Sequence, residues 1–90
     1  MSAGRELRLR DERLEWRAVA GEIVALDVRD SEYLAVNQSG RRLWEALTLG
    51  TNEDELRSIL QSTYGLSAEQ AGHDVEAFLA ELARRDLLAP

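Results

Sequence analysis

The side chains that most often carry out catalysis are scarce in this chain of 90 residues. His73 is the single histidine, and the sequence has no cysteine that it could activate as a nucleophile. A metal site would need several imidazole or thiolate ligands, whereas the sequence offers only scattered carboxylates. The glycines fall at expected turns and helix ends and form no phosphate-binding loop after a strand. We therefore expect a binding module or adaptor that uses no cofactor and no metal, rather than an enzyme.

The overall charge indicates the kind of partner that such a module would bind. The chain has 17 acidic residues against 11 basic residues, for a net charge of −6 at pH 7. This balance disfavours non-specific binding to phosphate backbones and favours cationic partners. The longest strictly apolar runs, such as residues 23–26, are too short to span a membrane, and residues 1–13 lack the apolar segment of a signal peptide. Together with the absence of cysteine, these features predict a cytoplasmic protein.

The chain is organised around two strands that run into a helix. Residues 22–28 alternate between apolar and polar side chains, residues 29–32 form a polar break of hairpin length, and residues 33–36 are again β-prone. Residues 14–20 form a preceding strand, so the simplest topology is an antiparallel meander of three strands. Residues 1–13 could supply a short edge strand or a frayed tail, and the pattern leaves both open.

The alternation in these strands predicts which side chains face the core. We expect Val24, Leu26 and Val28 to share the apolar face of their strand. Leu34 and Val36 would then continue that face on the next strand.

Three helices are expected after the strands, at about residues 39–49, 52–64 and 67–85. Gly50 and Gly65 end the first two, and capping-box patterns begin the second, at either residue 51 or residue 52, and the third, at residue 67. The apolar face of the third helix consists of Ala71, Val75, Phe78, Leu79 and Leu82. The sequence thus predicts one domain over residues 1–90, with an α+β fold in which a three-stranded antiparallel sheet precedes three helices, winged-helix-like in outline.

This order of elements resembles the PqqD-like domains, also called RiPP recognition elements, which bind the leader segments of ribosomally made peptide precursors. The resemblance covers roughly residues 14–88 and depends on the order and spacing of several short motifs. These are Tyr33-Leu34-Ala35-Val36-Asn37, Leu43-Trp44, Gly50-Thr51, the run from Asp74 to Leu82 and Leu87-Leu88. A chain of this length is most similar to the stand-alone leader-binding half of a split lasso-peptide B protein. One departure is Asp86, which stands where the family usually has glycine, although aspartate tolerates the left-handed conformation better than most residues.

The resemblance implies a binding site and the roles of its residues. The leader would add as a strand to the edge formed by Tyr33, Leu34, Ala35 and Val36. On the third helix, Val75, Phe78 and Leu82 would line apolar pockets, while Asp74 and Glu81 would meet basic residues of the leader. Helical spacing by itself favours the core for Val75, Leu79 and Leu82. Trp44 is assigned to the core.

The implied partners are a precursor leader peptide with basic residues and a separate leader protease of transglutaminase-like fold. A second interpretation within the family is a PqqD-type chaperone that presents a precursor to a radical SAM enzyme in pyrroloquinoline quinone synthesis. A third is a structural adaptor that docks on an enzyme and binds no peptide. The sequence leaves these alternatives open.

A winged-helix DNA-binding protein is the alternative from a different class. The last helix of such proteins enters the major groove and is usually basic on its exposed face. Here the third helix carries more acidic than basic residues, which would repel phosphates. The acidic residues are Glu69, Asp74, Glu76 and Glu81, and the basic ones are Arg84 and Arg85.

Overall fold

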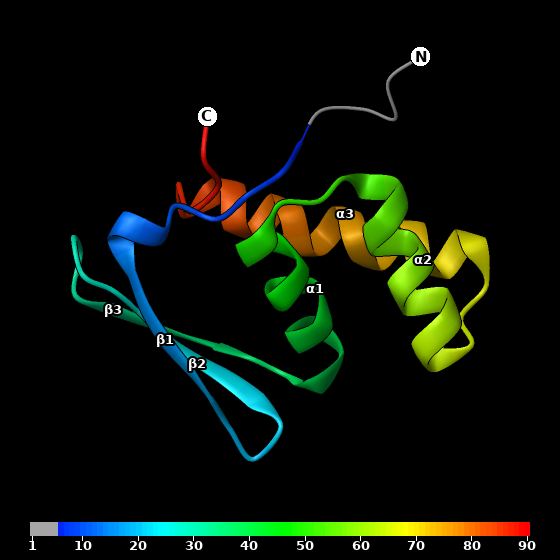
Figure 1. The fold of residues 1–90 in the computed structure, drawn as a ribbon, viewed down its shortest axis with the longest axis horizontal. Helices are drawn as coiled ribbons and strands as arrows, with labels where there is room; N and C mark the ends of the chain where they lie inside the picture. The colour runs from blue at the N-terminus through cyan, green and yellow to red at the C-terminus, as the bar shows by residue number, and fades with distance from the viewer. Residues whose placement is uncertain (1–5) are drawn as a thin grey trace.

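The computed structural model describes residues 6–90 and shows a three-stranded sheet with all three helices on one side of it (Figure 1). A 3-10 turn, η1 (Asp11–Arg13), leads into the strands, and the helices follow in chain order. The elements are β1 (Leu14–Val19), β2 (Glu22–Asp27), β3 (Glu32–Val36), α1 (Gln38–Leu49), α2 (Glu53–Tyr64) and α3 (Ala68–Arg84). The strands are antiparallel in the order β1-β2-β3, which confirms the predicted meander and fold class.

The two hairpins are closed by short turns that use the left-handed backbone region. Ala20 and Gly21 form the two-residue turn between β1 and β2, with φ values of 53° and 83°. Positive φ at both turn positions is typical of a type I′ turn, whose twist matches that of the flanking strands. Ser31, at φ 57°, ends the longer turn between β2 and β3.

The buried face of β2 is the opposite of the one that the alternation predicted. Ile23 and Ala25 are fully buried, whereas Val24 and Val28 are 39% and 44% exposed on the outer face. The prediction for Val24, Leu26 and Val28 was therefore wrong. Residues 23–26 are all apolar, so both the odd-numbered and the even-numbered side chains could face the core. The alternation could not choose between the two faces, and packing against α1 decided which one is buried.

The strand register shows what the core face of the sheet contains. Val36 is opposite Ile23, and Leu34 is opposite Ala25, so both β3 side chains face the helices as expected, but beside different β2 residues than predicted.

Each helix begins with a side-chain cap that the sequence contains locally. The side chains of Asn37, Asn52 and Ser67 accept hydrogen bonds from the backbone N–H groups three residues later, at 3.0, 2.9 and 3.0 Å. Asn52 rather than Thr51 caps α2, which resolves the two alternatives for that helix. Gly65 ends α2 in the left-handed conformation.

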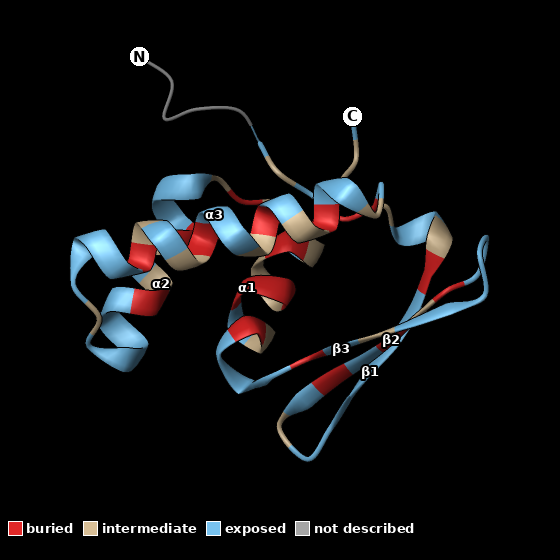
Figure 2. Cartoon of the chain, turned by 180° about the vertical axis from the view of Figure 1, so that it is seen from behind, coloured by how far each residue is buried: buried red, intermediate tan, exposed pale blue. Residues whose placement is uncertain are grey.

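The core lies between the inner face of the sheet and the three helices, as the buried positions in Figure 2 show. Trp44 on α1 is fully buried at its centre, which confirms its assignment to the core. Trp16 on β1 packs against it edge to face, with ring centroids 6.0 Å apart, and remains 37% exposed. None of the helices in residues 6–90 has the length and apolar character needed to cross a membrane.

The segment before β1 neither joins the sheet nor frays in the part that the structure describes. Leu9 is buried in the core, and isolated bridges pair Leu7 with Thr51 and Leu9 with Leu88. Residues 1–5, which were included in the prediction of an edge strand or tail, lie outside the described residues.

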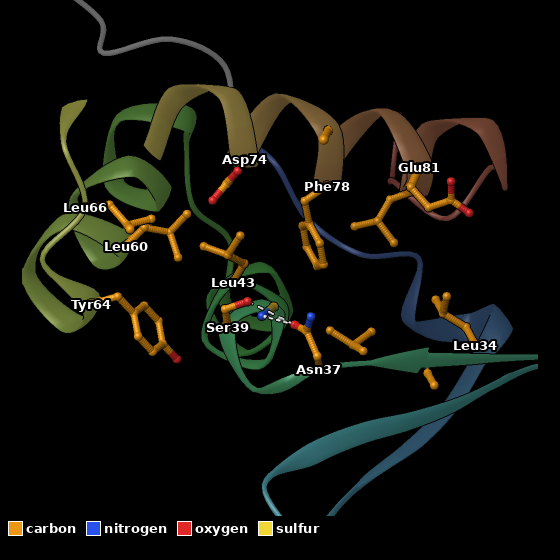
Figure 3. Close-up of a pocket in the computed structure, with 15 residues that line it drawn as sticks. Leu34, Asn37, Ser39, Leu43, Leu60, Tyr64, Leu66, Asp74, Phe78 and Glu81 are labelled. Carbon is orange, nitrogen blue, oxygen red and sulfur yellow. Dashed lines mark hydrogen bonds between the residues drawn. The ribbon is translucent and has the colours of Figure 1, made fainter. Parts of the chain in front are cut away.

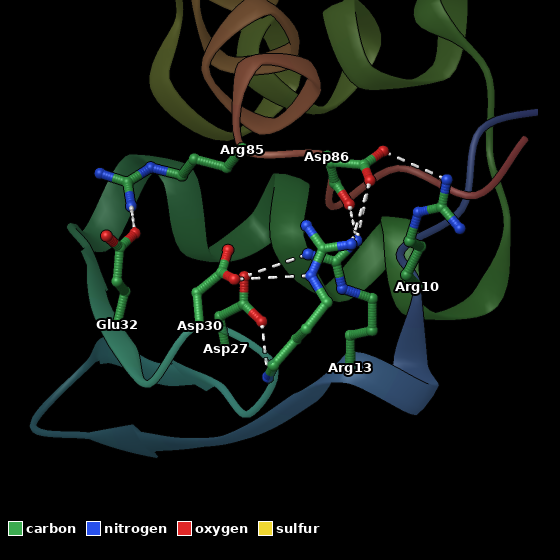
Figure 4. A network of polar contacts seen from close by, with 8 residues as sticks. Arg10, Arg13, Asp27, Asp30, Glu32, Arg85 and Asp86 are labelled. Atoms are coloured by element: carbon green, nitrogen blue, oxygen red, sulfur yellow. Dashed lines mark hydrogen bonds and ion pairs between the residues drawn. The ribbon is translucent and has the colours of Figure 1, made fainter.

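Ion pairs hold the C-terminal end of α3 against the sheet (Figure 4). Arg13 donates to the Asp86 carboxylate at 2.9 Å and lies 3.3 Å from the carboxylate of Asp27, while Arg10 donates to Asp86 at 3.2 Å. Asp27 is buried on the inner face of the sheet, where an unpaired charge would be costly. The hydrogen bond from Arg13, followed by the charge of Arg10, lowers the pKa of Asp86. Asp86 adopts φ 59°, so aspartate does occupy the left-handed position after α3.

Candidate functional site

The outer edge of β3 is open among the described residues, and the hydrogen-bond pattern identifies which backbone groups face it. The N–H of Val28 donates to the carbonyl of Arg13 at 2.9 Å, so even-numbered residues of β2 bond to β1. Odd-numbered residues of β2 therefore bond to β3, where their partners are Glu32, Leu34 and Val36. By alternation, the N–H and C=O groups of Tyr33 and Ala35 point to the open edge.

A groove of about 700 Å³ lies between this edge and α3 (Figure 3). We call it the β3–α3 groove. It is lined by Leu34, Ala35, Val36, Asn37, Ser39, Gly40, Leu43, Leu60, Tyr64, Leu66, Asp74, Ala77, Phe78, Glu81 and Leu82. Most of these side chains are apolar, and the polar ones lie at the start of α1 and on α3.

The two walls of the groove are positioned by the local structure that precedes them. Val36 ends β3, and Asn37 caps α1 directly afterwards, so strand and helix meet at a sharp corner. Gly40 lies at that corner, where a Cβ atom would come within 2.5 Å of Val36 Cγ1 and 3.2 Å of Phe78 Cε1. The absence of a side chain at Gly40 thus lets β3, α1 and α3 converge on the groove.

The structure brings most of the predicted site residues together on this groove. Leu34, Ala35 and Val36 line it from β3, while Asp74, Phe78, Glu81 and Leu82 line it from α3. Phe78 is half-buried and projects into the middle of the groove (Figure 3).

Two predicted site residues are placed differently. Val75 is fully buried and does not line the groove, because it lies on the core stripe of α3 between Ala71 and Leu79. The structure therefore places Val75 in the core rather than at an apolar pocket. Tyr33 is 73% exposed on the outer face of the sheet, so it reaches the open edge through its backbone but not the groove through its side chain.

The two acidic groups of the groove differ in their neighbours. Glu81 accepts hydrogen bonds from Arg84 and Arg85, and these bonds lower the pKa of Glu81. Arg85 also lies 4.0 Å from Glu32, so it connects the end of α3 to the start of β3. Asp74 accepts a hydrogen bond from the neutral side chain of Gln70 at 2.8 Å. Within residues 6–90, no arginine donates a hydrogen bond to Asp74, so of the two carboxylates it is Asp74 whose charge is not balanced in this way.

The far end of the groove, beyond β3, was not anticipated from the sequence. Leu60, Tyr64 and Leu66 form it together with Ser39 and Leu43 (Figure 3). The Tyr64 hydroxyl donates to the backbone carbonyl of Gln38 at 3.1 Å and thereby connects the end of α2 to the start of α1.

A local signal for this end exists but is weak. Tyr64 and Leu66 flank the helix-ending Gly65. Only the packing of α2 against α3 brings them to the groove. Residues 6–90 contain no cluster of three or more side chains suited to holding a metal ion.

The fold and the groove define a class of small α+β domains in which an open sheet edge runs beside an apolar groove. The family model described as coenzyme PQQ synthesis protein D (PqqD) matches residues 22–88, and the chain belongs to this family. No curated protein shows significant sequence similarity to it.

Two solved structures share its fold. The structure of TbiB1 in complex with the TbiA(beta) leader peptide superposes with a TM-score of 0.82 at 23% sequence identity, covering 90% of this chain and 93% of that one. A lasso peptide synthetase B1 complexed with its leader peptide superposes with a TM-score of 0.81 at 24% identity, covering 93% of this chain and 98% of that one.

Proposed function

We propose that this protein binds the leader segment of a ribosomally synthesised precursor peptide by adding it as a strand to β3. The observation that carries the proposal is the open edge of β3 beside an apolar groove. The membership in the PqqD family and the two structural neighbours, both solved with leader peptides, support it. The domain itself is a non-catalytic binding module.

The geometry indicates how such a peptide would be recognised. Main-chain bonds to Tyr33 and Ala35 supply affinity that does not depend on the peptide sequence. Alternate side chains of the added strand point to opposite faces of the sheet, so every second one enters the groove. The groove takes apolar side chains against Leu34, Val36 and Phe78, and Asp74 favours a basic residue near its far end.

The bound leader is then presented to a maturation enzyme. We propose a separate lasso-peptide leader protease, because one of the two structural neighbours is a lasso peptide synthetase B1 complexed with the leader peptide and no nucleophile–base pair is evident in this sequence. The outer face of the sheet, which exposes Val24, Val28 and Tyr33 next to the open edge, offers an apolar surface for that contact. The second candidate is presentation to a radical SAM enzyme in pyrroloquinoline quinone synthesis, which the description of the matching family favours.

Single proline substitutions in β3 test strand addition. Proline removes the backbone N–H, which at Ala35 points to the open edge and at Leu34 bonds to β2. We expect Ala35→Pro to leave a folded domain that no longer binds the leader, and Leu34→Pro to unfold it. Circular dichroism and calorimetric titration with candidate lasso and PQQ precursor leaders would measure both effects. A folded Ala35→Pro variant that binds normally would show that the peptide does not add to this edge.

A further inference from the structure

The sheet has a second edge, on β1, which the proposed leader site does not use. The hydrogen bond from the Val28 N–H to the Arg13 carbonyl also identifies the β1 residues whose backbone groups bond to β2. These are residues 15, 17 and 19. The backbone groups of Trp16 and Ala18 therefore face outward, together with the carbonyl of Leu14, whose N–H is bonded to Asp11. Within residues 6–90, none of these outward groups has a backbone partner.

The β1 edge has few of the features that usually prevent edge-to-edge pairing. Natural proteins protect such edges with charged side chains, lysine above all, or with proline, a bulge or a covering segment. Residues 14–19 contain neither lysine nor proline and pair with β2 in unbroken register, and their two charged side chains, Glu15 and Arg17, are of opposite sign. Five of the six residues are exposed, including Trp16, which packs edge to face on Trp44.

We propose that β1 pairs antiparallel with β1 of a second copy of this chain, about a two-fold axis at Trp16. In this register Trp16 is opposite itself and Leu14 is opposite Ala18 of the other copy. All of these residues direct free backbone groups outward, so the Trp16 positions exchange two hydrogen bonds and each Ala18 N–H donates to the opposing Leu14 carbonyl. A two-fold contact of this kind is self-complementary.

Charge selects this register over its neighbours. Centring the axis on Trp16 places Glu15 opposite Arg17 of the other copy, and Arg17 opposite Glu15, on the outer face of the joined sheet. These are non-hydrogen-bonded positions, where opposing side chains lie closest. If the axis moved by one residue, the outward backbone groups of the two copies would still pair. Glu15 would then lie opposite Glu15, or Arg17 opposite Arg17, and like charges directly opposite each other are destabilising.

The contact has the size of a weak interface. One edge of a six-residue strand buries much less than the roughly 1,200–2,000 Å² of a stable complex. The dimer is therefore reversible and concentration-dependent. It leaves the β3 edge free, so leader binding and self-association are independent.

Charge reversal provides a matched set of variants. In E15R both outward charges of β1 are positive, and in R17E both are negative, so each variant should dimerise about tenfold or more weakly than the parent chain. An equimolar mixture of E15R and R17E restores both opposite-charge pairs and should associate as a heterodimer. Sedimentation equilibrium over a concentration series at low salt measures all three, with circular dichroism to check folding.

A backbone variant completes the test. Ala18→Pro removes an N–H that points away from β2, so it should stay folded, bind leader normally and fail to dimerise. Ala35→Pro, at the other edge, should dimerise normally. A parent chain that stays monomeric at every concentration overturns the proposal. So does a dimer unaffected by E15R and R17E, or a mixture of the two folded variants that does not associate.

Discussion

The two helical glycines Gly40 and Gly72 allow the packing of the groove to be tested with one pair of matched substitutions. Replacing glycine by alanine inside a helix stabilises a protein by roughly 0.5–1 kcal/mol when the added methyl group meets no obstacle. At Gly72 in α3 the new Cβ would lie 3.5 Å from the Arg57 Cδ, an ordinary contact. At Gly40 it would lie 2.5 Å from Val36 Cγ1, which is too close for the present arrangement.

The expected magnitudes follow from this difference. Val36 is buried and β-branched, so its side chain has few alternative rotamers, and overpacking a core usually costs about 1–3 kcal/mol. We expect Gly72→Ala to stabilise the domain by about 0.5–1 kcal/mol, and Gly40→Ala to destabilise it by about 0–2.5 kcal/mol once the helical gain is included. Gly40→Ala should also weaken leader binding, because relief of the contact displaces Val36 or Phe78 in the walls of the groove.

Urea unfolding followed by tryptophan fluorescence measures the stabilities, and calorimetric titration measures leader affinity. Gly72 does not line the groove, so its variant serves as the control for helix propensity and should bind normally. If Gly40→Ala stabilises the domain as much as Gly72→Ala and binds leader equally well, the convergence of β3, α1 and α3 on Gly40 is not a constraint, and the reasoning is refuted.

Three further outcomes are expected at the groove and at the ion pairs. Phe78→Ala should reduce leader affinity about tenfold or more, and should lower the free energy of unfolding by less than the roughly 3–5 kcal/mol lost at a fully buried phenylalanine. A collapse of the melting temperature in the absence of peptide would instead show that Phe78 is a core residue. Asp74→Asn should weaken the binding of a basic leader about twofold to fivefold at low salt, and Glu81→Gln should weaken it less because two arginines already neutralise Glu81. If titrations at two salt concentrations show that the two variants lose the same affinity, this prediction is contradicted. Because the pKa of Asp86 is lower in the folded state than in the unfolded chain, its ion pairs stabilise the fold above the ordinary carboxyl pKa and are lost as the pH falls through the lowered value. Asp86→Asn keeps a residue that tolerates the left-handed conformation, so its melting temperature should fall less steeply with acid than that of the parent chain, and identical pH profiles would argue against the role of Asp86.

Local signals in the sequence were sufficient for the order and the ends of the elements. Asn52, Ser67 and Gly65 act within one helical turn of their own position, because a capping side chain or a left-handed residue satisfies backbone groups only three or four residues away. The apolar face predicted for α3 included Phe78, for which the family resemblance implied a role in a pocket, and the structure places its side chain in the groove.

The faces of β2 depended on tertiary packing. Residues 23–26 are apolar in succession, so either parity could be buried, and the choice was made by contact with the helices. The same choice buried Asp27, which is paired with Arg13.

The composition of the groove also depended on tertiary structure. Val75 and Phe78 are three residues apart on α3, yet one contacts only the core and the other lines the groove, because the helix turns by about 300° between them. Tyr64 and Leu66 reach the far end of the groove only because α2 packs against α3. Local sequence determines which segments form strands and helices, since those forces act over a few residues. The open backbone groups of Tyr33 and Ala35, and the cavity beside them, exist only once distant segments have packed together.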